Sequence, residues 1–356
     1  MDPHVHLREP GATESETVAS GLAAAARGGF AAVVAMPNTT PPGDSVDWVR
    51  RQLAAGAAPG GTRLFPSACI TRGRSGAEVA DIEALAGAGA AFFTDDGSFV
   101  ENTAVMERAM KRIAALGMVV CQHAMTPTCG VIRDCALARR LNLPVVTATV
   151  ETDAIRRDIS LCRETGCRLH VQHISTAEGV SLVRGAQGEG LPVTAEATPH
   201  HLLFTCDDLA EDDAVFKMAP PLGNREDRAE LRKAVKDGVL MFATDHAPHS
   251  AAKKEGGFRK AANGVIGLET AVPATYAVMV EEEGMSVEKW AEAWWKMPRR
   301  IIRGVDGRDL AETRVAVGSP RAVDPAAFAS LSRNCPFRGM EFKCWPVTAG
   351  RKGEAP

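Results

Sequence analysis

The first residues of the chain place two histidines one position apart, at His4 and His6, and an arginine follows at Arg8. Alternate residues of a β-strand point to the same face, so both imidazoles can reach a single metal ion. The arginine side chain offers a planar fork of donors that matches a carboxylate. By itself the H-x-H spacing favours a metal site about as much as a chance pair of surface residues. Together with Arg8 it predicts a metal site with an anion-binding group beside it.

Apolar, β-branched runs alternate along the chain with segments of helical pattern. We expect strands at residues 5–7, 31–36, 63–70, 90–93, 118–122, 168–172, 192–196 and 239–243. Helices are expected between them, for example at residues 16–27, 105–115, 152–164 and 225–236. Nearly continuous apolar strands that alternate with helices are typical of a parallel sheet covered on its outside. Eight such units predict an α/β fold, a (β/α)₈ barrel of the TIM type.

The ends of the expected strands carry side chains that can do chemistry. They bear His4 and His6, Asp95 and Asp96, His123, His173, and the segment from Asp245 to His249. In a barrel the carboxyl ends of the strands converge on one mouth, where active sites form. A ring of imidazole and carboxylate ligands suits divalent zinc and, less specifically, other transition metals. One such residue would usually be a hydrogen-bonded polar group or a helix cap, but the whole set favours a metal centre.

The composition excludes several classes of partner. The chain has 356 residues, 45% of them hydrophobic and 24% charged, with a formal net charge of -3. Because the charge is near neutral and no long basic stripe occurs, neither nucleic acid nor an anionic membrane is expected as a partner. We find no signal peptide before the first motif and no apolar run of transmembrane length. The nine cysteines contain no C-x-x-C pair, which favours reduced thiols in a cytoplasmic protein.

The order of the motifs resembles that of the dihydroorotases of the amidohydrolase superfamily, in particular the class I bacterial enzymes. The segment His4-x-His6-Leu7-Arg8-Glu9-Pro10-Gly11 is similar to the signature of that family. The motifs that follow in the family order are M-P-N-T at 36–39, T-D-D-G at 94–97, Q-H-I-S at 172–175, T-P-H-H at 198–201, A-T-D-H-A-P-H at 243–249 and G-L-E-T at 267–270. The similarity runs from residue 2 to about residue 305.

The resemblance implies a zinc centre with two Zn²⁺ ions per subunit. Its ligands would be His4, His6 and Asp245 for the first ion, His123 and His173 for the second, and an acidic residue between the two. Related hydrolases often bridge their metals with a carbamylated lysine, whereas the class I pattern has an aspartate. The spacing to His123 assigns the bridge to Asp96 rather than Asp95, which would support the ligands from behind.

The resemblance also implies the reaction, the reversible hydrolysis of the cyclic amide of L-dihydroorotate to N-carbamoyl-L-aspartate in pyrimidine biosynthesis. A metal-activated hydroxide would attack the ring amide, with Asp245 as general base and acid. Arg8 and Asn38 would hold the substrate carboxylate, and His249 would assist. Asn263 and Gly264 would contact the substrate near the mouth, at the end of a loop over residues 250–264.

Three departures from the family pattern affect these expectations. Ala219 stands where the family has an asparagine that contacts substrate, and Gly223 replaces an arginine. Only three residues precede His4, where the family has several tens, and the closing segment after Arg303 is shortened. We therefore expect a barrel domain over residues 1–305 and, over 306–356, a remnant of a small β-sandwich that is largely missing, in a truncated reading or a compact variant. Exposed strand edges in that remnant would favour a homodimer.

Two other functions remain open. A hydantoinase or allantoinase would share the barrel and the H-x-H motif, but such enzymes usually depend on the carbamylated lysine and lack the context of Arg8. A weak or silent homologue could instead be a structural partner of aspartate transcarbamoylase. The missing sandwich and Ala219 favour that alternative modestly, whereas the six filled ligand positions oppose it. We expect His200 and His201 to be hydrogen-bonded core residues, and His170 and His246 to be structural.

Overall fold

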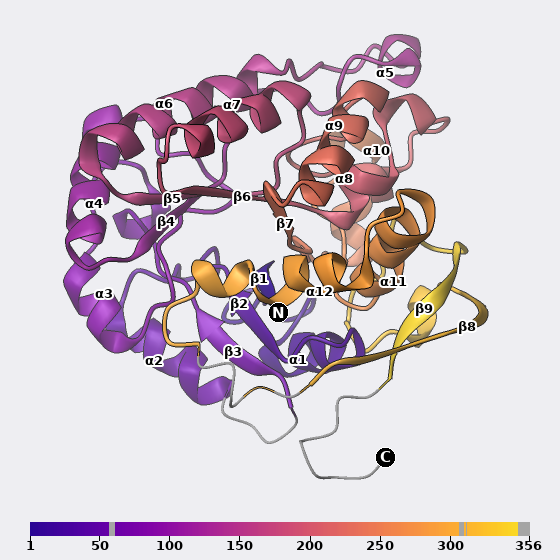
Figure 1. The fold of residues 1–356 in the computed structure, drawn as a ribbon, viewed down its shortest axis with the longest axis horizontal. Coiled ribbons are helices and arrows are strands. Elements are labelled where there is room, and N and C mark those ends of the chain that lie inside the picture. The colour runs from indigo at the N-terminus through magenta and orange to yellow at the C-terminus, as the bar shows by residue number, and fades with distance from the viewer. Residues whose placement is uncertain (57–60, 306–309, 311, 348–356) are drawn as a thin grey trace.

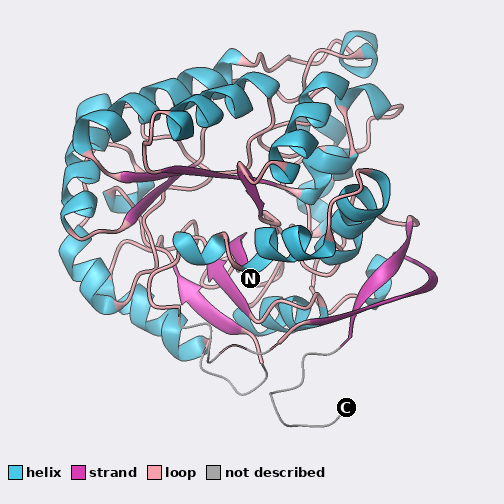
Figure 2. Ribbon diagram, viewed as in Figure 1, coloured by secondary structure: helices cyan, strands magenta, loops and turns pink. Residues whose placement is uncertain are grey.

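The computed structural model describes residues 1–56, 61–305, 310 and 312–347. Helices surround a central set of strands, and an antiparallel hairpin lies at one side (Figures 1 and 2). The central strands are β1 (Asp2–Val5), β2 (Ala32–Ala35), β3 (Arg63–Pro66), β4 (Val119–Gln122), β5 (Arg168–Val171), β6 (Val193–Ala197) and β7 (Leu240–Phe242). Every pair of neighbours among them is parallel, as the alternation of strands and helices predicts.

The strands close into a barrel through short bridges. Strands β1 to β3 form one sheet and β4 to β7 another. Phe93 bridges the two sheets, because it pairs with Ala68 on one side and Val120 on the other. His246 pairs with Val5 and so joins the last strand position to the first. The segment expected as a strand at 90–93 is hydrogen-bonded to both neighbours, since Ala91 N donates to the carbonyl of Pro66 at 2.8 Å and Phe93 N to that of Val119 at 3.1 Å. The (β/α)₈ prediction is confirmed.

The helices begin at residues whose side chains satisfy their first backbone N–H groups. Thr17, Ser45, Asn102 and Thr176 each accept such a hydrogen bond. The helices are α1 (Val18–Arg27), α2 (Val46–Ala55), α3 (Ile82–Ala88), α4 (Thr103–Ala115), α5 (Ala136–Arg140), α6 (Thr149–Thr165), α7 (Ala177–Gly188), α8 (Pro199–Leu203), α9 (Arg225–Lys236), α10 (Gly257–Lys260), α11 (Ala271–Thr275) and α12 (Val287–Trp295). Helix α11 continues as a wider π-helical segment over Tyr276–Glu282. Single 3-10 turns occur at Arg72–Arg74, Cys206–Asp208, Ala214–Phe216, Ala251–Lys254, Pro298–Arg300 and Pro325–Ala327. The four helices expected from the sequence are confirmed, and α9 has the expected bounds.

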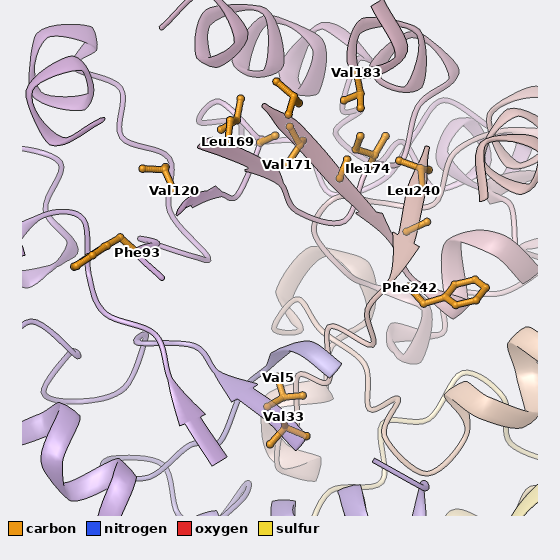
Figure 3. Close-up of a cluster of buried hydrophobic side chains, with 14 of the residues drawn as sticks. Val5, Val33, Phe93, Val120, Leu169, Val171, Ile174, Val183, Leu240 and Phe242 are labelled. Atoms are coloured by element: carbon orange, nitrogen blue, oxygen red, sulfur yellow. The ribbon is translucent and has the colours of Figure 1, made fainter. Parts of the chain in front are cut away.

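Alternate strand residues pack into two different cores. Val33 and Val120 belong to the large cluster between strands and helices, part of which Figure 3 shows. Val34 and Val119, their neighbours in sequence, belong to a second cluster inside the barrel. Burying one such side chain stabilises the fold by roughly 1.5–3 kcal/mol. Because each strand is packed on both faces, its end and the polar residues that follow it are fixed at the mouth of the barrel.

The C-terminal part of the chain packs against this barrel. Strands β8 (Arg314–Ala322) and β9 (Glu341–Val347) pair as an antiparallel hairpin, and β8 is exposed along most of its length. Between them, Ser332 Oγ donates to the carbonyl of Ser15 at 2.7 Å, close to the start of α1. The division into domains 1–305 and 306–356 stays a prediction, and residues 306–309, 311 and 348–356 lie outside the described residues. Within the described residues, no helix is both long and apolar enough to cross a membrane.

Candidate active site

The loops after the strands bring the first three expected ligands together. His4 Nε2 lies 3.3 Å from Asp245 Oδ1, and His6 Nε2 lies 3.1 Å from the same oxygen. All three side chains are buried. The two histidines project from one face of the chain at the end of β1, as the H-x-H spacing predicts, while Asp245 follows β7 at the neighbouring position of the barrel.

Asp96 lies between this group and a second pair of histidines. Its Oδ1 is 3.3 Å from His4 Nε2, 3.6 Å from His123 Nδ1 and 3.7 Å from His173 Nε2. Its Oδ2 is 3.3 Å from His6 Nε2. His123 and His173 approach each other to 2.9 Å between ring nitrogens. One carboxylate thus faces both histidine pairs, which is the placement that a bridging ligand requires.

The donor atoms of this cluster fit a divalent metal. His4 Nε2 and Asp96 Oδ1 are buried and make no hydrogen bond, which is costly unless another partner takes their lone pairs. Two overlapping groups have ligand atoms within 4.8 Å of one another, namely His4, His6 and Asp245, and His4, Asp96 and His173. Imidazole nitrogens and carboxylate oxygens in such groups are typical of zinc and other transition-metal sites.

The electrostatics of the cluster favour ionised carboxylates. Burial alone would raise the pKa of Asp96, but the charge on His4 and the nearby rings of His123 and His173 hold it well below its ordinary value. The pKa of Asp245 is lowered in the same way, against the effect of burial, by His4 and His6. Burial lowers the pKa of His6 and of His123, which keeps both rings neutral, as ligands must be.

A second layer of side chains orients the ligands. His4 Nδ1 lies 2.6 Å from Glu196 Oε1, and Glu196 Oε2 lies 2.9 Å from His170 Nε2. His6 Nδ1 lies 2.8 Å from Asn38 Oδ1. In both pairs the oxygen holds a proton on Nδ1, so that Nε2 faces the cluster with its lone pair. Burial would raise the pKa of Glu196, but His4 and His170 lower it to about 2, so this carboxylate is ionised.

Sequence reasoning missed Glu196, although one signal could have found it. Glu196 is the only ionisable residue of strand β6 (Val193–Ala197), and it is 1% exposed. Buried carboxylates are rare unless they are paired. Glu196 is the last residue of the strand expected at 192–196, but the candidate ligands selected at strand ends did not include it.

The backbone at two ligand positions adopts a conformation that non-glycine residues rarely take. His173 has φ of 35° and Asp245 has φ of 46°. Such strain persists where the surrounding structure enforces it and is common at functional sites. At Asp245 the enforcement comes from Asp2, whose carboxylate accepts from Thr244 N at 3.0 Å and from His4 N at 3.2 Å. Asp2 thereby ties the two loops that carry the first ligand group.

Asp95 has a different role from its neighbour. Its carboxylate accepts hydrogen bonds from Ile70 N at 2.8 Å, from Thr71 N at 3.1 Å and from the hydroxyl of Thr71. Asp95 therefore secures the loop after β3, and none of its side-chain hydrogen bonds within the described residues is to a ligand side chain. The expectation that Asp95 supports the ligands from behind stays a prediction. The preference for Asp96 over Asp95 at the cluster agrees with the geometry.

A polar cavity of about 210 Å³ opens above the cluster. Its lining brings together nearly all the expected site residues and adds three small ones; it consists of His6, Arg8, Asn38, Asp96, Gly97, His123, His173, Ala219, Asp245, Ala247, His249, Asn263 and Gly264. His4 lies beneath it and is fully buried. A larger apolar cavity, lined by Trp290, Trp294 and other residues, contains none of the ligands.

One wall of the cavity is positively charged. Arg8 Nε donates to the carbonyl of Pro248 at 3.1 Å, and its Nη2 lies 3.5 Å from His249 Nε2. No ion pair among the described residues involves Arg8, so its charge is free to bind an anion. His249 Nε2 lies 2.7 Å from the carbonyl of Asn263. Burial and the charge of Arg8 lower the pKa of His249 to about 3, so the ring is neutral and donates from Nε2.

The two histidines after β6 differ from each other. His201 is a hydrogen-bonded core residue, as expected, because Nδ1 lies 2.7 Å from Thr198 Oγ1 and Nε2 lies 3.0 Å from the carbonyl of Pro220. The same expectation is wrong for His200, whose two ring nitrogens are buried without any hydrogen bond. Burial lowers the pKa of His200 well below its ordinary value, so this ring is neutral.

The closed parallel barrel with buried histidines and aspartates clustered at its mouth is typical of metal-dependent hydrolases of the amidohydrolase type. Residues 1–179 match the family model described as dihydro-orotase-like. A dihydroorotase of Bacillus caldolyticus is 42% identical over 365 residues, which cover 98% of this chain and 83% of that protein. A dihydroorotase of Geobacillus thermodenitrificans is 41% identical with the same coverage. The chain therefore belongs to the dihydroorotase family, and this membership implies a metal cofactor.

Solved structures agree on the fold. An L-hydantoinase from Arthrobacter aurescens superposes with a TM-score of 0.84 at 26% identity, over 99% of this chain and 83% of that one. A dihydroorotase from Saccharomyces cerevisiae, in complex with 5-fluoroorotic acid, gives a TM-score of 0.75 over 98% of this chain and 97% of that one. Its identity of 17% supports the barrel fold alone.

Proposed function

We propose that this protein is a dihydroorotase, which interconverts L-dihydroorotate and N-carbamoyl-L-aspartate in pyrimidine biosynthesis. The observation that carries the proposal is the juxtaposition of the buried ligand cluster with Arg8, whose charge has no carboxylate partner among the described residues. A substrate with both a cyclic amide and a carboxylate satisfies the two features at once. The relatives that are 41–42% identical over nearly the whole chain carry the same activity in their names.

The proposed cofactor is a pair of zinc ions, held by His4, His6 and Asp245 on one side and by His123 and His173 on the other, with Asp96 between them. When bound, they would lower the pKa of a water molecule and polarise the amide carbonyl, which supplies hydroxide near neutral pH. Asp245 makes its contacts to the histidines through Oδ1, so Oδ2 is left to take the proton of the attacking water. It returns that proton to the departing amide nitrogen.

The remaining lining residues hold the substrate. Arg8 binds its carboxylate through the guanidinium fork and is oriented by the carbonyl of Pro248, which accepts from Arg8 Nε, while His249 lies beside Nη2. Asn38 uses its oxygen on His6, so its amide nitrogen is the group left for the substrate. Gly264 brings its backbone to the cavity wall, where a side chain would lie 2.6 Å from Ala247 Cβ. Arg8, His249 and Asn38 thus set the orientation, while Asn263 and Gly264 shape the mouth.

A hydantoinase or allantoinase activity is the second candidate, and the fold likeness to L-hydantoinase favours it. Two features count against it. The bridging position has Asp96, and none of the described residues that line the cavity is a lysine that could be carbamylated. Hydantoin also lacks the carboxylate that Arg8 is placed to bind. A silent homologue, which would act as a structural partner of aspartate transcarbamoylase, is disfavoured because all six ligand positions are filled and drawn together.

Two further proposals concern the setting of the enzyme. All nine cysteines are free, which supports a reducing, cytoplasmic location. The exposed strand β8, with Val317 57% exposed, supports a homodimer through the hairpin. Sedimentation of the purified protein tests the dimer.

The test of the function is turnover of L-dihydroorotate, hydantoin and allantoin by zinc-loaded protein. We expect hydrolysis of dihydroorotate alone, its loss on chelation, and its recovery when zinc is returned. In Asp245→Asn the turnover should fall on the order of 10²–10⁴-fold, since a general acid–base contributes that much. The melting temperature should be retained, and Asp237→Asn on the surface is the control. Near-normal turnover by Asp245→Asn with metal bound would contradict the assignment.

A further inference from the structure

Asn334 lies far from the barrel in sequence but next to the cavity in space. It belongs to the segment between β8 and β9 and is 4% exposed. Its Nδ2 donates to the carbonyl of Ala247 and to the carbonyl of Gly264, both at 3.0 Å. Its Oδ1 accepts from His249 N at 3.3 Å. One buried side chain therefore uses its donors and its acceptor on two separate loops.

These two loops carry the proposed substrate contacts. Ala247, His249 and Gly264 line the cavity. Next to them, the carbonyl of Pro248 accepts from Arg8 Nε, and the carbonyl of Asn263 lies 2.7 Å from His249 Nε2. The loop after β7 and the loop that ends at residue 264 thus meet in one network. Asn334 joins them from behind, on the side away from the substrate.

The junction of the loops leaves little room for adjustment. Gly264 has φ of +133°, and a Cβ there would lie 2.6 Å from Ala247 Cβ. From the other side, Lys254 Nζ donates to the carbonyl of Gly264 at 2.9 Å and to that of Ala262 at 2.9 Å. The carbonyl of Gly264 therefore receives one hydrogen bond from Asn334 and one from Lys254. Without the Asn334 donor, the carbonyl of Gly264 would be hydrogen-bonded only to Lys254, so the loop that forms the cavity wall would be held from one side.

Asn334 is itself held in place by its own segment. Its backbone carbonyl accepts from Ile266 N at 3.0 Å. Three residues later, Phe337 is buried in a cluster with Ile266. The side chain of Asn334 is thus presented to the loops from a fixed backbone, which is what a positioning group needs.

We infer that Asn334 is a positioning residue, which holds His249, Arg8 and Gly264 in the arrangement that binds the substrate carboxylate. The inference rests on the proposed function, because it takes those residues as the carboxylate site. It gives the segment between β8 and β9 a part in substrate binding. Asn334 itself lies behind the cavity wall and is not among the lining residues, so its effect is on affinity rather than on the chemical step.

The experiment compares Asn334→Ala with Ser332→Ala in the zinc-loaded enzyme. Both variants lose buried hydrogen bonds of the same segment, but the hydroxyl of Ser332 bonds Ser15 instead of the substrate loops. We expect Asn334→Ala to raise the KM for dihydroorotate about tenfold, equivalent to about 1.4 kcal/mol, with kcat changed by less than about twofold. Metal content should be unchanged, and the Kd of 5-fluoroorotate should rise by the same factor as KM. Equal KM values in the two variants, or a loss confined to kcat, would overturn the inference.

Asn334→Asp sharpens the comparison, and hydrogen exchange separates this inference from the proposed function. Asp keeps an acceptor for His249 N but loses the two amide protons, so its KM should follow that of the alanine variant. The amides of residues 247–266 should exchange faster in Asn334→Ala than in the wild type or Ser332→Ala. If the wild type fails to hydrolyse dihydroorotate, the proposed function is wrong, and the exchange rates still decide whether Asn334 holds the loops. Unchanged exchange would show that it does not.

Discussion

The contact between Glu196 and His4 makes a quantitative prediction about metal affinity. Glu196 Oε1 lies 2.6 Å from His4 Nδ1, and both side chains are at most 1% exposed. A hydrogen bond to a charged group contributes about 1.5–3 kcal/mol, and one between neutral groups about 0.5–1.5 kcal/mol. Glu196→Gln exchanges the first kind for the second at nearly constant shape. The loss of about 1–2 kcal/mol corresponds to a metal affinity about 5–30-fold weaker, which overlaps the roughly 10–100-fold range usual for the partner of a ligating histidine.

The loss of metal affinity measured for Glu196→Gln depends on pH. Burial works against a proton on His4, but the carboxylates of Asp96, Glu196 and Asp245 together raise its pKa well above the ordinary value. A protonated His4 competes with the metal, so Glu196 both strengthens the ligand and retains the competing proton. The affinity loss in Glu196→Gln should therefore be largest at about pH 8 and smaller at about pH 6.

The assay is a competition titration of zinc against a chelator of known affinity, at both pH values, with the melting temperature of the metal-free protein measured in parallel. Thr194→Val is the matched control, since it removes the contact of Thr194 Oγ1 to His170 Nδ1 at 2.9 Å and leaves the pair of Glu196 and His4 intact. Equal zinc affinities for the wild type and Glu196→Gln at about pH 8 would refute the reasoning. So would an equal loss in Thr194→Val, because the effect would then not come through His4.

Two other predictions concern the cavity wall. Ala219 lines the cavity but presents only a methyl group, so Ala219→Asn should lower the KM for dihydroorotate about fivefold, which is about 1 kcal/mol for one added hydrogen bond. A KM that stays the same or rises would show that the amide does not reach the substrate, and Ala219→Val controls for the added volume. Burial, and after it the charge of Arg8, lower the pKa of His249 from its ordinary value of 6.5 to about 3. Between these two pH values His249 is protonated in the unfolded chain and neutral in the folded one. Stability due to His249 is therefore present above about pH 6.5 and is lost as the pH falls towards 3. Denaturant unfolding at about pH 7 and pH 5 should show the wild type losing about 1–2 kcal/mol more than His249→Asn. An equal loss in the two proteins would contradict this result.

Local pattern was sufficient to predict the barrel and the candidate ligands. The two-residue period of His4 and His6 places both side chains on one face of a strand, whatever the rest of the fold does. The capped helices and the apolar strands carry their own signals, and α9 (Arg225–Lys236) has the predicted bounds. The strand expected at residues 90–93 pairs with both neighbours through backbone hydrogen bonds of Ala91, Phe92 and Phe93, although only Phe93 forms full β-bridges.

Contacts between distant parts of the chain could not be predicted in this way. Glu196 meets His4 across 192 residues, and Asn334 meets Ala247 across 87. Asn334 does not stand out in its own segment, since an asparagine in a loop has many ordinary roles, and the charge of Glu196 in its strand does not indicate which residue it meets. The difference between Asp95 and Asp96 is of the same kind. The turn that carries both residues directs the carboxylate of Asp95 to Thr71 and that of Asp96 to the histidines.

The sequence by itself determined which atoms can bind metal and carboxylate, because ligand chemistry belongs to residue type and strand period is local. The tertiary structure decided the burial, the hydrogen bonding and the protonation of those atoms. It buried His4 Nε2 and Asp96 Oδ1 without hydrogen bonds, left Arg8 without a carboxylate partner among the described residues, and fixed the protons on Nδ1 of His4 and His6. The physical reason is that burial and charge act through space, so they depend on neighbours that only the closed barrel brings together.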